Sequence, residues 1–348
     1  MGEAPQWFTK ALAAPHTSRA INVPGPNGAA CRIVYLHFAR RPAPVSTDVA
    51  EDGQQDEQAQ QQPQQASAQQ QLFFVHGGSA HAHWWSHIIP FFLDAGEAVS
   101  INLSGMGESE HRSDGYTIET YAEELRAVAD DAGFVAPVLV SHSFGGYVAS
   151  CAAARYPSRF AGVVLVESSI RPPGDEIDYG DSKVVSVRPR KTYPDLATMR
   201  SHFRLWPPPE NPSANPFIRD HFFDHAVKPV EEGSGGGYTW RYDERRSTLG
   251  KLYSHRHLEA ASGAGVPFAV IWGESSGSWN TKYQYRSLPR PELSPVLRYM
   301  RRALPGGTPF VGIPDATHHC MVDQPLAVVA ALRALLLDQR FAGRSRAL

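Results

Sequence analysis

One serine of the sequence is flanked by the small residues that a nucleophile at a sharp turn requires. Ser143 lies in the run Ser141-His142-Ser143-Phe144-Gly145-Gly146. The apolar residues 137–140 before it predict a strand, and the small residues 146–155 after it predict a helix. In a tight strand-to-helix turn the central hydroxyl is exposed, and small neighbours let the helix and the strand pack closely. The positive end of the helix also favours a developing negative charge, so we expect Ser143 to be a nucleophile.

A pair of glycines earlier in the chain could supply the second part of such a site. The run His76-Gly77-Gly78-Ser79 follows the apolar residues 72–75, which predict a strand. Glycines let the backbone approach a bound molecule closely and turn an N–H group toward it. We expect the N–H groups of Gly78 and Phe144 to form a two-donor oxyanion hole.

Two adjacent histidines near the end of the chain could supply a general base. Asp315-Ala316-Thr317-His318-His319-Cys320 follows an expected strand over residues 309–313 and precedes a helix expected over 326–337. Loops that follow parallel strands meet at one edge of the sheet, so an imidazole here can reach the serine turn. An imidazole can take the proton of a serine hydroxyl as it attacks a carbonyl and can return that proton to the leaving group.

These three segments, in this order, resemble the α/β-hydrolase superfamily, and in particular its cap-carrying serine esterase and lactonase branch. The resemblance covers roughly residues 33–337, apart from a glutamine-rich tract, and is weak over 171–265. It implies an α/β-hydrolase fold and a Ser-His-acid mechanism with the acid between serine and histidine in the chain. Related sequences end in Gly-His-x6-Pro, and His318 stands at that offset from Pro325. We therefore expect His318 to be the base and His319 to be a neighbouring or core histidine.

The acid departs from its usual place in the family. Relatives often carry Asp at the end of a Gly-x-x-Asp turn, and here that turn reads Gly273-Glu274-Ser275-Ser276, so serine fills the position. The alternative position follows the preceding strand, where Leu165-Val166 is followed by Glu167. A carboxylate at the end of an apolar strand is costly to bury without a partner, and an imidazolium partner explains it. We expect Glu167 to be the acid and keep Glu274 as the alternative.

The remaining pattern predicts the elements that hold these groups. Apolar runs alternate with helical spacing, which indicates an α/β fold with a mostly parallel central sheet and helices on both faces. We expect the core to comprise residues 1–170 and 266–348, with a disordered, glutamine-rich loop over about 50–71. Beyond the segments given above, we expect strands over residues 32–38, 98–103, 163–166 and 268–272 and a helix over 118–129.

The segment 171–265 breaks the alternation and is rich in proline, glycine and aromatic residues. We expect it to be an inserted helical cap over a cleft at the sheet edge, with short helices over residues 195–206 and 217–226. Side chains here and near the two turns could contact the substrate, and the candidates are Gly77, Ser79, Trp85, Phe203, Trp206, Phe222 and Trp240. A cleft with so many aromatic candidates favours a hydrophobic acyl or aryl substrate.

Composition argues against several other classes of protein. The net charge is −2, with 33 basic and 35 acidic residues and no basic stripe, so we expect no nucleic-acid partner. No apolar stretch approaches the roughly 18 residues of a membrane span, and the first residues lack a signal-peptide pattern, so we expect a cytoplasmic protein. His81, His83 and His87 lack an accompanying acid, and Gly105-Met106-Gly107 lacks the rest of a nucleotide loop. We therefore expect neither a metal nor a cofactor.

Together these features favour a serine hydrolase that cleaves a carboxylic ester or lactone of a hydrophobic substrate through an acyl-enzyme on Ser143. A carbon–carbon bond hydrolase with the same three groups is the enzymatic alternative. A small-ligand receptor built on a hydrolase-like scaffold is the alternative from another class.

Overall fold

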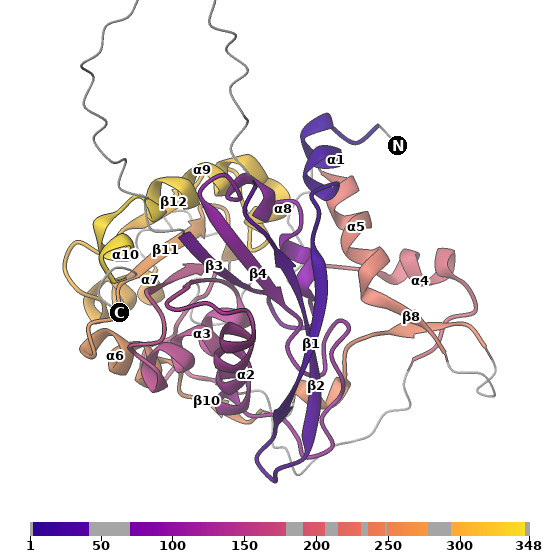
Figure 1. The fold of residues 1–348 in the computed structure, drawn as a ribbon, viewed down its shortest axis with the longest axis horizontal. Coiled ribbons are helices and arrows are strands. Elements are labelled where there is room, and N and C mark those ends of the chain that lie inside the picture. The colour runs from indigo at the N-terminus through magenta and orange to yellow at the C-terminus, as the bar shows by residue number, and fades with distance from the viewer. Residues whose placement is uncertain are drawn as a thin grey trace, which may run out of the picture.

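A computed structural model describes residues 3–41, 70–178, 191–205, 215–230, 236–247, 249–277 and 294–344. These residues include one eight-stranded sheet, with helices packed beside it (Figure 1). Its strands, in spatial order, are β1 (Thr17–Pro24), β2 (Ala30–Phe38), β4 (Gly96–Ile101), β3 (Gln70–Val75), β5 (Val138–His142), β6 (Gly162–Val166), β11 (Phe268–Gly273) and β12 (Phe310–Ile313). The pairs β1–β2 and β2–β4 are antiparallel, and every pair from β4 to β12 is parallel. The expected mostly parallel sheet is therefore confirmed.

The central strands are apolar because both of their faces are covered. Every residue of β5, β6 and β11 is buried. Successive side chains of a strand point to opposite faces, and β3 shows this directly. Phe73 and Val75 belong to one apolar cluster, whereas Leu72 and Phe74 belong to the cluster on the other side.

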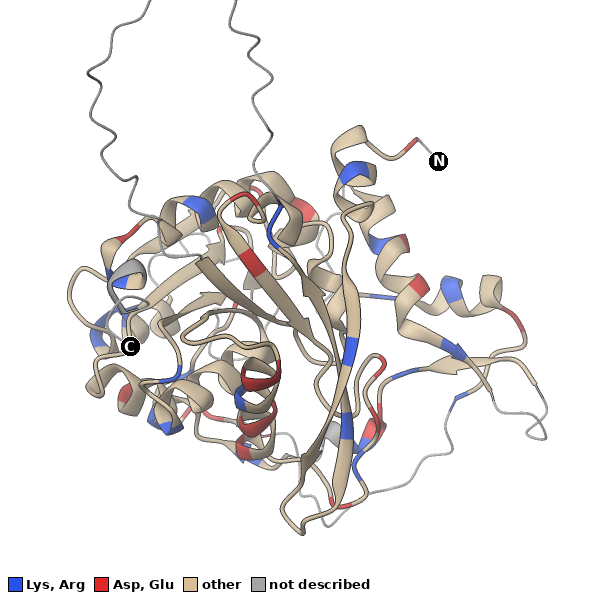
Figure 2. Cartoon of the chain, viewed as in Figure 1, with Lys and Arg blue, Asp and Glu red and all other residues tan. Residues whose placement is uncertain are grey.

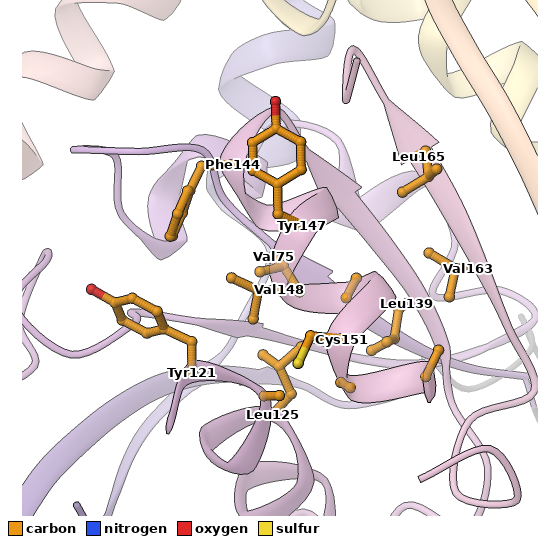
Figure 3. Close-up of a cluster of buried hydrophobic side chains, with 14 of the residues drawn as sticks. Val75, Tyr121, Leu125, Leu139, Phe144, Tyr147, Val148, Cys151, Val163 and Leu165 are labelled. Carbon is orange, nitrogen blue, oxygen red and sulfur yellow. The ribbon is translucent and has the colours of Figure 1, made fainter. Parts of the chain in front are cut away.

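Two layers of helices cover the sheet. One layer holds α2 (Ile118–Asp131), α3 (Phe144–Arg155), α6 (Ser254–Gly263) and α7 (Pro295–Ala303), whose buried apolar side chains belong to the first cluster. Figure 3 shows part of this cluster, where Tyr121 and Leu125 of α2 face Val148 and Cys151 of α3. The other face carries α1 (Gln6–Leu12), the 3-10 turns η1 (Ala82–Trp85) and η2 (Ile89–Phe91), α8 (Cys320–Asp323), α9 (Pro325–Leu336) and α10 (Gln339–Arg344).

The chain between β6 and β11 leaves the sheet and returns to it. It contains β7 (Ile177–Asp178), α4 (Leu196–His202), α5 (Pro216–Ala226), β8 (Val227–Pro229), β9 (Tyr238–Trp240), η3 (Glu244–Ser247) and β10 (Lys251–Leu252). β7 pairs with β10, so the excursion begins and ends at the same place. We call residues 171–253 the insertion. The expected segment ran to residue 265, but α6 packs against α3 beside the sheet (Figure 1) and so belongs to the helical layer.

Several features lay outside the prediction or outside the described residues. The sequence reasoning did not predict α1, β1 or α7. The glutamine-rich loop and Trp206 lie outside the described residues, apart from the start of β3. Figure 2 shows acidic and basic residues interspersed along the visible elements, with no basic stripe in this view. No helix in the described ranges is both long and apolar enough to cross a membrane. The cysteines Cys31, Cys151 and Cys320 are all buried and free.

Candidate active site

Ser143 lies at the sharp turn between β5 and α3. Its backbone adopts φ 53° and ψ −120°, a conformation that L-residues avoid unless the surroundings enforce it. The Ser143 N–H donates to the carbonyl of Val166 on the next strand at 3.0 Å. A Cβ on Gly145 would lie 2.5 Å from the carbonyl oxygen of His76, so only glycine lets α3 start this close to β3. The turn thus presents the Ser143 hydroxyl beyond the carboxyl edge of the sheet.

His318 reaches that hydroxyl from the loop after β12. Its Nε2 lies 2.9 Å from Ser143 Oγ. Two contacts hold this loop in place. The Asp323 carboxylate accepts hydrogen bonds from the Thr317 N–H at 2.8 Å and from the Thr317 hydroxyl at 2.6 Å. The carbonyl of His318 accepts a hydrogen bond from His142 Nε2–H at 2.9 Å.

His142 stays neutral beside this histidine. Burial, together with the nearby imidazoles of His318 and His319, holds the pKa of His142 well below its ordinary value. Because its Nε2–H donates to a carbonyl, its tautomer is also fixed. His142 therefore supports the loop without placing a second positive charge beside His318.

Glu167 supplies the carboxylate that faces His318 from the other side. Its Oε2 lies 3.1 Å from His318 Nδ1, and its side chain is fully buried. The same carboxylate accepts the Gly273 N–H at 2.5 Å and the Ser276 hydroxyl at 2.8 Å. Three donors compensate the loss of hydration that an ionised carboxylate suffers in the interior. Like Ser143, Glu167 has a positive φ, of 49°.

Glu274, the alternative acid, lies elsewhere. Its side chain is exposed, and a Cβ on Gly312 of β12 would lie 2.5 Å from its Oε1, which places the carboxylate over that strand. The prediction missed the role of Ser276, which fills the last position of the turn that begins at Gly273, where the family resemblance would place the acid. Its hydroxyl contacts Glu167 instead, so a signal was present in the sequence but its meaning was not evident without the geometry.

The predicted oxyanion turn lies directly against the serine turn. A Cβ on Gly77 would lie 2.8 Å from His142 Nδ1 and 3.3 Å from Ser143 Cβ, and one on Gly78 would lie 3.6 Å from Phe144 Cβ. His76 fixes the turn, because its Nδ1–H donates to the Gly77 carbonyl at 2.7 Å and its Nε2 accepts the Leu103 N–H at 3.1 Å. Phe144 is the first residue of α3, where the helix dipole is positive.

A cavity of about 400 Å³ opens above Ser143 and His318. Of the predicted substrate contacts, Gly77, Ser79, Phe203 and Trp240 line it. The prediction was wrong for two residues. Trp85 is fully buried against Phe74, and Phe222 is fully buried and stacked on Trp84.

The cavity lining also contains residues that the sequence reasoning did not select. Trp84 stands where Trp85 was expected, and Tyr193 and Tyr242 add to the aromatic wall. The charged residues Lys191, Arg204 and Glu244 contribute to the lining as well, so the cavity is less uniformly apolar than predicted.

Two groups of side chains in the described residues have the composition of metal ligands, and neither includes Ser143, Glu167 or His318. They are His83 with His221 and His225, and Glu119 with Cys151 and His257.

Comparison with known proteins agrees with this architecture. A sequence model described as the alpha/beta hydrolase family matches residues 72–332, three quarters of the chain. The chain belongs to the α/β-hydrolase family. The carboxyl-edge location of Ser143, Glu167 and His318 is where open α/β sheets bind ligands in general.

Individual relatives of this α/β-hydrolase are named as esterases. Esterase Rv0045c of Mycobacterium tuberculosis is 26% identical over 278 residues, which covers 76% of this chain and 82% of that protein. Polyneuridine aldehyde esterase of Rauvolfia serpentina is 30% identical over 163 residues, but the match spans only 59% of its length and 44% of this chain. The names of these relatives support the assignment of this chain as a hydrolase.

Solved structures share the fold. The structure of esterase Rv0045c superposes with a TM-score of 0.60 at 19% identity, covering 95% of this chain and 96% of that one. A thioesterase domain from the curacin biosynthetic pathway gives a TM-score of 0.63 at 18% identity, covering 92% and 100%.

Proposed function

We propose that this protein is a serine esterase that hydrolyses carboxylic esters through an acyl-enzyme on Ser143. The proposal is carried by one observation, the continuous hydrogen-bond chain from Glu167 through His318 to Ser143, at 3.1 and 2.9 Å. Family membership and the esterase-named relatives support the same reaction class.

In the proposed first half-reaction, Ser143 Oγ attacks the ester carbonyl carbon while His318 Nε2 takes its proton. The carbonyl oxygen becomes an oxyanion, which the N–H groups of Gly78 and Phe144 stabilise. Glu167 accepts the Nδ1–H of His318, and this keeps the Nε2 lone pair directed at the serine and stabilises the imidazolium. As the carbon–oxygen bond of the ester breaks, His318 returns the proton to the leaving alcohol.

Water completes the cycle in the second half-reaction. His318 Nε2 removes a proton from water as the water oxygen attacks the acyl carbon. The tetrahedral intermediate collapses with release of the carboxylic acid, and the proton returns to Ser143 Oγ.

The cavity supports an ester with an aromatic or long apolar group as substrate. Its volume of about 400 Å³ falls in the range for small-molecule sites, and Trp84, Phe203 and Trp240 supply apolar surface. Ten of the lining residues come from the insertion, namely Lys191, Tyr193, His202, Phe203, Arg204, Leu205, Ala226, Trp240, Tyr242 and Glu244. We therefore propose that the insertion acts as a cap that shapes the cavity. A lactone, as an internal ester, would follow the same steps.

The test is hydrolysis of a p-nitrophenyl ester series by the wild type, Ser143→Ala and Ser141→Ala. Ser141 is a matched control, since it lies two residues earlier on β5 and its hydroxyl donates to the Val164 carbonyl at 3.1 Å. Loss of the nucleophile should lower kcat by about 10⁴-fold or more, and Ser141→Ala should keep most of it. Equal turnover by Ser143→Ala would contradict the proposal. Adding lactones and a vinylogous diketone separates ester cleavage from carbon–carbon cleavage.

A further inference from the structure

Three imidazoles meet between the insertion and the sheet, away from Ser143. His221 and His225 lie one turn apart on α5, and His83 lies in η1, more than a hundred residues earlier in the chain. One ring nitrogen from each lies within 4.8 Å of the other two. We propose that His83, His221 and His225 bind a divalent transition metal ion of the Zn²⁺, Ni²⁺ or Co²⁺ class.

The arrangement is close to what such an ion requires. Histidines four residues apart on a helix present both rings on one face, and the His221 and His225 ring centroids are 4.8 Å apart. The His83 ring stacks on that of His225, with centroids 3.6 Å apart and an angle of 13° between the planes. Nitrogens bound at about 2.0–2.1 Å in a tetrahedral site lie about 3.3 Å apart. Side-chain rotations that tilt the stacked rings and bring the ring nitrogens up to about 1.5 Å closer together would complete the site.

Hydrogen bonds already orient two of the rings. His83 Nδ1 lies 3.2 Å from the Ser86 hydroxyl, and His221 Nε2–H donates to the carbonyl of His83 at 3.2 Å. Metal-binding histidines characteristically use one ring nitrogen for such a contact and the other for the ion. The His221 contact also joins α5 to η1 directly, so the two halves of the site are fixed relative to each other.

The chemical state of the rings suits a transition metal. All three side chains are half-buried, so an ion can enter from solvent and keep a water as its fourth ligand. Imidazole favours Zn²⁺, Ni²⁺ and Cu²⁺, whereas Mg²⁺ and Ca²⁺ require oxygen ligands.

The second group in the described residues, Glu119 with Cys151 and His257, is less suitable. Cys151 is fully buried, and burial raises the pKa of its thiol to about 12. A thiol binds a metal only as the thiolate, so this group would first have to lose a proton in an apolar interior.

The proposed ion would connect the insertion to the segment that follows the glycine turn. None of the three histidines lines the cavity, but Trp84, next to His83, does. Trp84 stacks on Phe222 of α5 with ring centroids 4.4 Å apart. Occupancy would therefore add to the contacts that hold α5 against η1 and stabilise this wall of the cavity.

The test measures metal binding, which does not depend on esterase activity. The full chain, without a histidine tag and freed of metal with EDTA, is titrated with Zn²⁺ in a calorimeter and with Co²⁺ by visible absorption. The expected result is one ion per chain, Co²⁺ bands of a four-coordinate site and a raised Tm, with no binding of Mg²⁺. Loss of an outer hydrogen-bond partner typically lowers metal affinity by about 10–100-fold. His221→Asn and His225→Asn remove ligands, so each should lower it by more than about 100-fold.

Two control variants make the result specific. His37→Gln removes an imidazole that contacts Glu97 on the sheet, and His318→Gln removes the imidazole beside Ser143. Both should bind Zn²⁺ like the wild type. Far-ultraviolet circular dichroism reports whether each variant is folded, and the two ligand variants are independent of each other. Unchanged affinity in folded His221→Asn and His225→Asn, or loss of binding only in His318→Gln, would overturn the proposal.

Discussion

Replacement of Glu167 by glutamine tests the proposed acid with almost no change in shape. In the wild type, the carboxylate accepts hydrogen bonds from Gly273 N–H, the Ser276 hydroxyl and His318 Nδ1. A carboxamide has one accepting oxygen and one donating NH₂. The Gly273 N–H cannot reverse and lies 2.5 Å from its acceptor, so the oxygen should stay there. The NH₂ then faces His318 Nδ1, whereas the Ser276 hydroxyl can rotate to accept.

The consequence is the wrong tautomer of His318. An NH₂ group that donates to Nδ1 requires the proton on Nε2, which then cannot accept the proton of Ser143. Loss of the correct tautomer lowers turnover by about 10⁴-fold in a serine triad, equivalent to about 5.5 kcal/mol in the activation barrier at 1.36 kcal/mol per tenfold. We expect this fall in kcat for p-nitrophenyl ester hydrolysis by Glu167→Gln.

Glu274→Gln is the matched control, because it makes the same chemical change in the exposed side chain of the alternative acid. Its kcat should remain within about threefold of the wild type, since exposed substitutions away from the site have small effects. Denaturant unfolding checks that both variants are folded. A Glu167→Gln enzyme within tenfold of the wild type, or a larger loss in Glu274→Gln, would refute the reasoning.

Three further outcomes follow from the geometry. Gly77→Ala would place a Cβ 2.8 Å from His142 Nδ1, so ester turnover should fall by roughly 10²-fold, as for loss of an oxyanion donor; unchanged kinetics would contradict the close approach. The pKa of His83 and of His221 is lower in the folded than in the unfolded chain, so the unfolded chain binds more protons below about pH 6.5. With EDTA present, the free energy of unfolding should be highest above that pH and fall toward pH 4, by up to about 1.4 kcal/mol per pH unit for each ring; urea titrations of the His83→Gln variant should show a shallower fall. Glu124 of α2 and Arg112 form a fully buried ion pair, with 2.8 Å between Glu124 Oε1 and Arg112 Nη2. Glu124→Ala leaves the Arg112 guanidinium buried without this partner and should lower the free energy of unfolding by about 3–5 kcal/mol. A change below about 1 kcal/mol would argue against a buried ion pair.

The central strands could be predicted because burial on both faces of the sheet requires an unbroken run of apolar residues. β5, β6 and β11 are short apolar runs, and their turns carry the small or polar residues from which the site was inferred. β1 was missed because it is an edge strand with only one buried residue, Val23, so it has no hydrophobic pattern. A strand can thus be predicted from composition where both of its faces are buried, as in β5, and not where most of its residues are exposed, as in β1.

The proximity of the three proposed catalytic residues could also be predicted from the sequence, because the carboxyl ends of parallel strands lie at one edge of the sheet. Ser143, Glu167 and His318 follow β5, β6 and β12, and the structure brings their side chains within hydrogen-bond distance. The sequence does not show in the same way which direction an aromatic side chain points. Trp84 faces the cavity and its neighbour Trp85 faces the core, a difference set by the 3-10 turn η1.

Contacts between segments that are distant in the chain could not be predicted from the sequence. His81, His83 and His87 were considered together because they are neighbours in the chain. The structure instead groups His83 with two residues of α5, and this depends on how the insertion folds back over η1.

The most direct test of the central claim is covalent labelling of the folded enzyme with a fluorophosphonate, followed by peptide mass spectrometry. We expect one adduct per chain, on Ser143, formed at a rate that falls steeply in His318→Gln and is unaffected in Glu274→Gln. An adduct on another residue, or no adduct in protein shown to be folded, would contradict the assignment of Ser143 as the nucleophile.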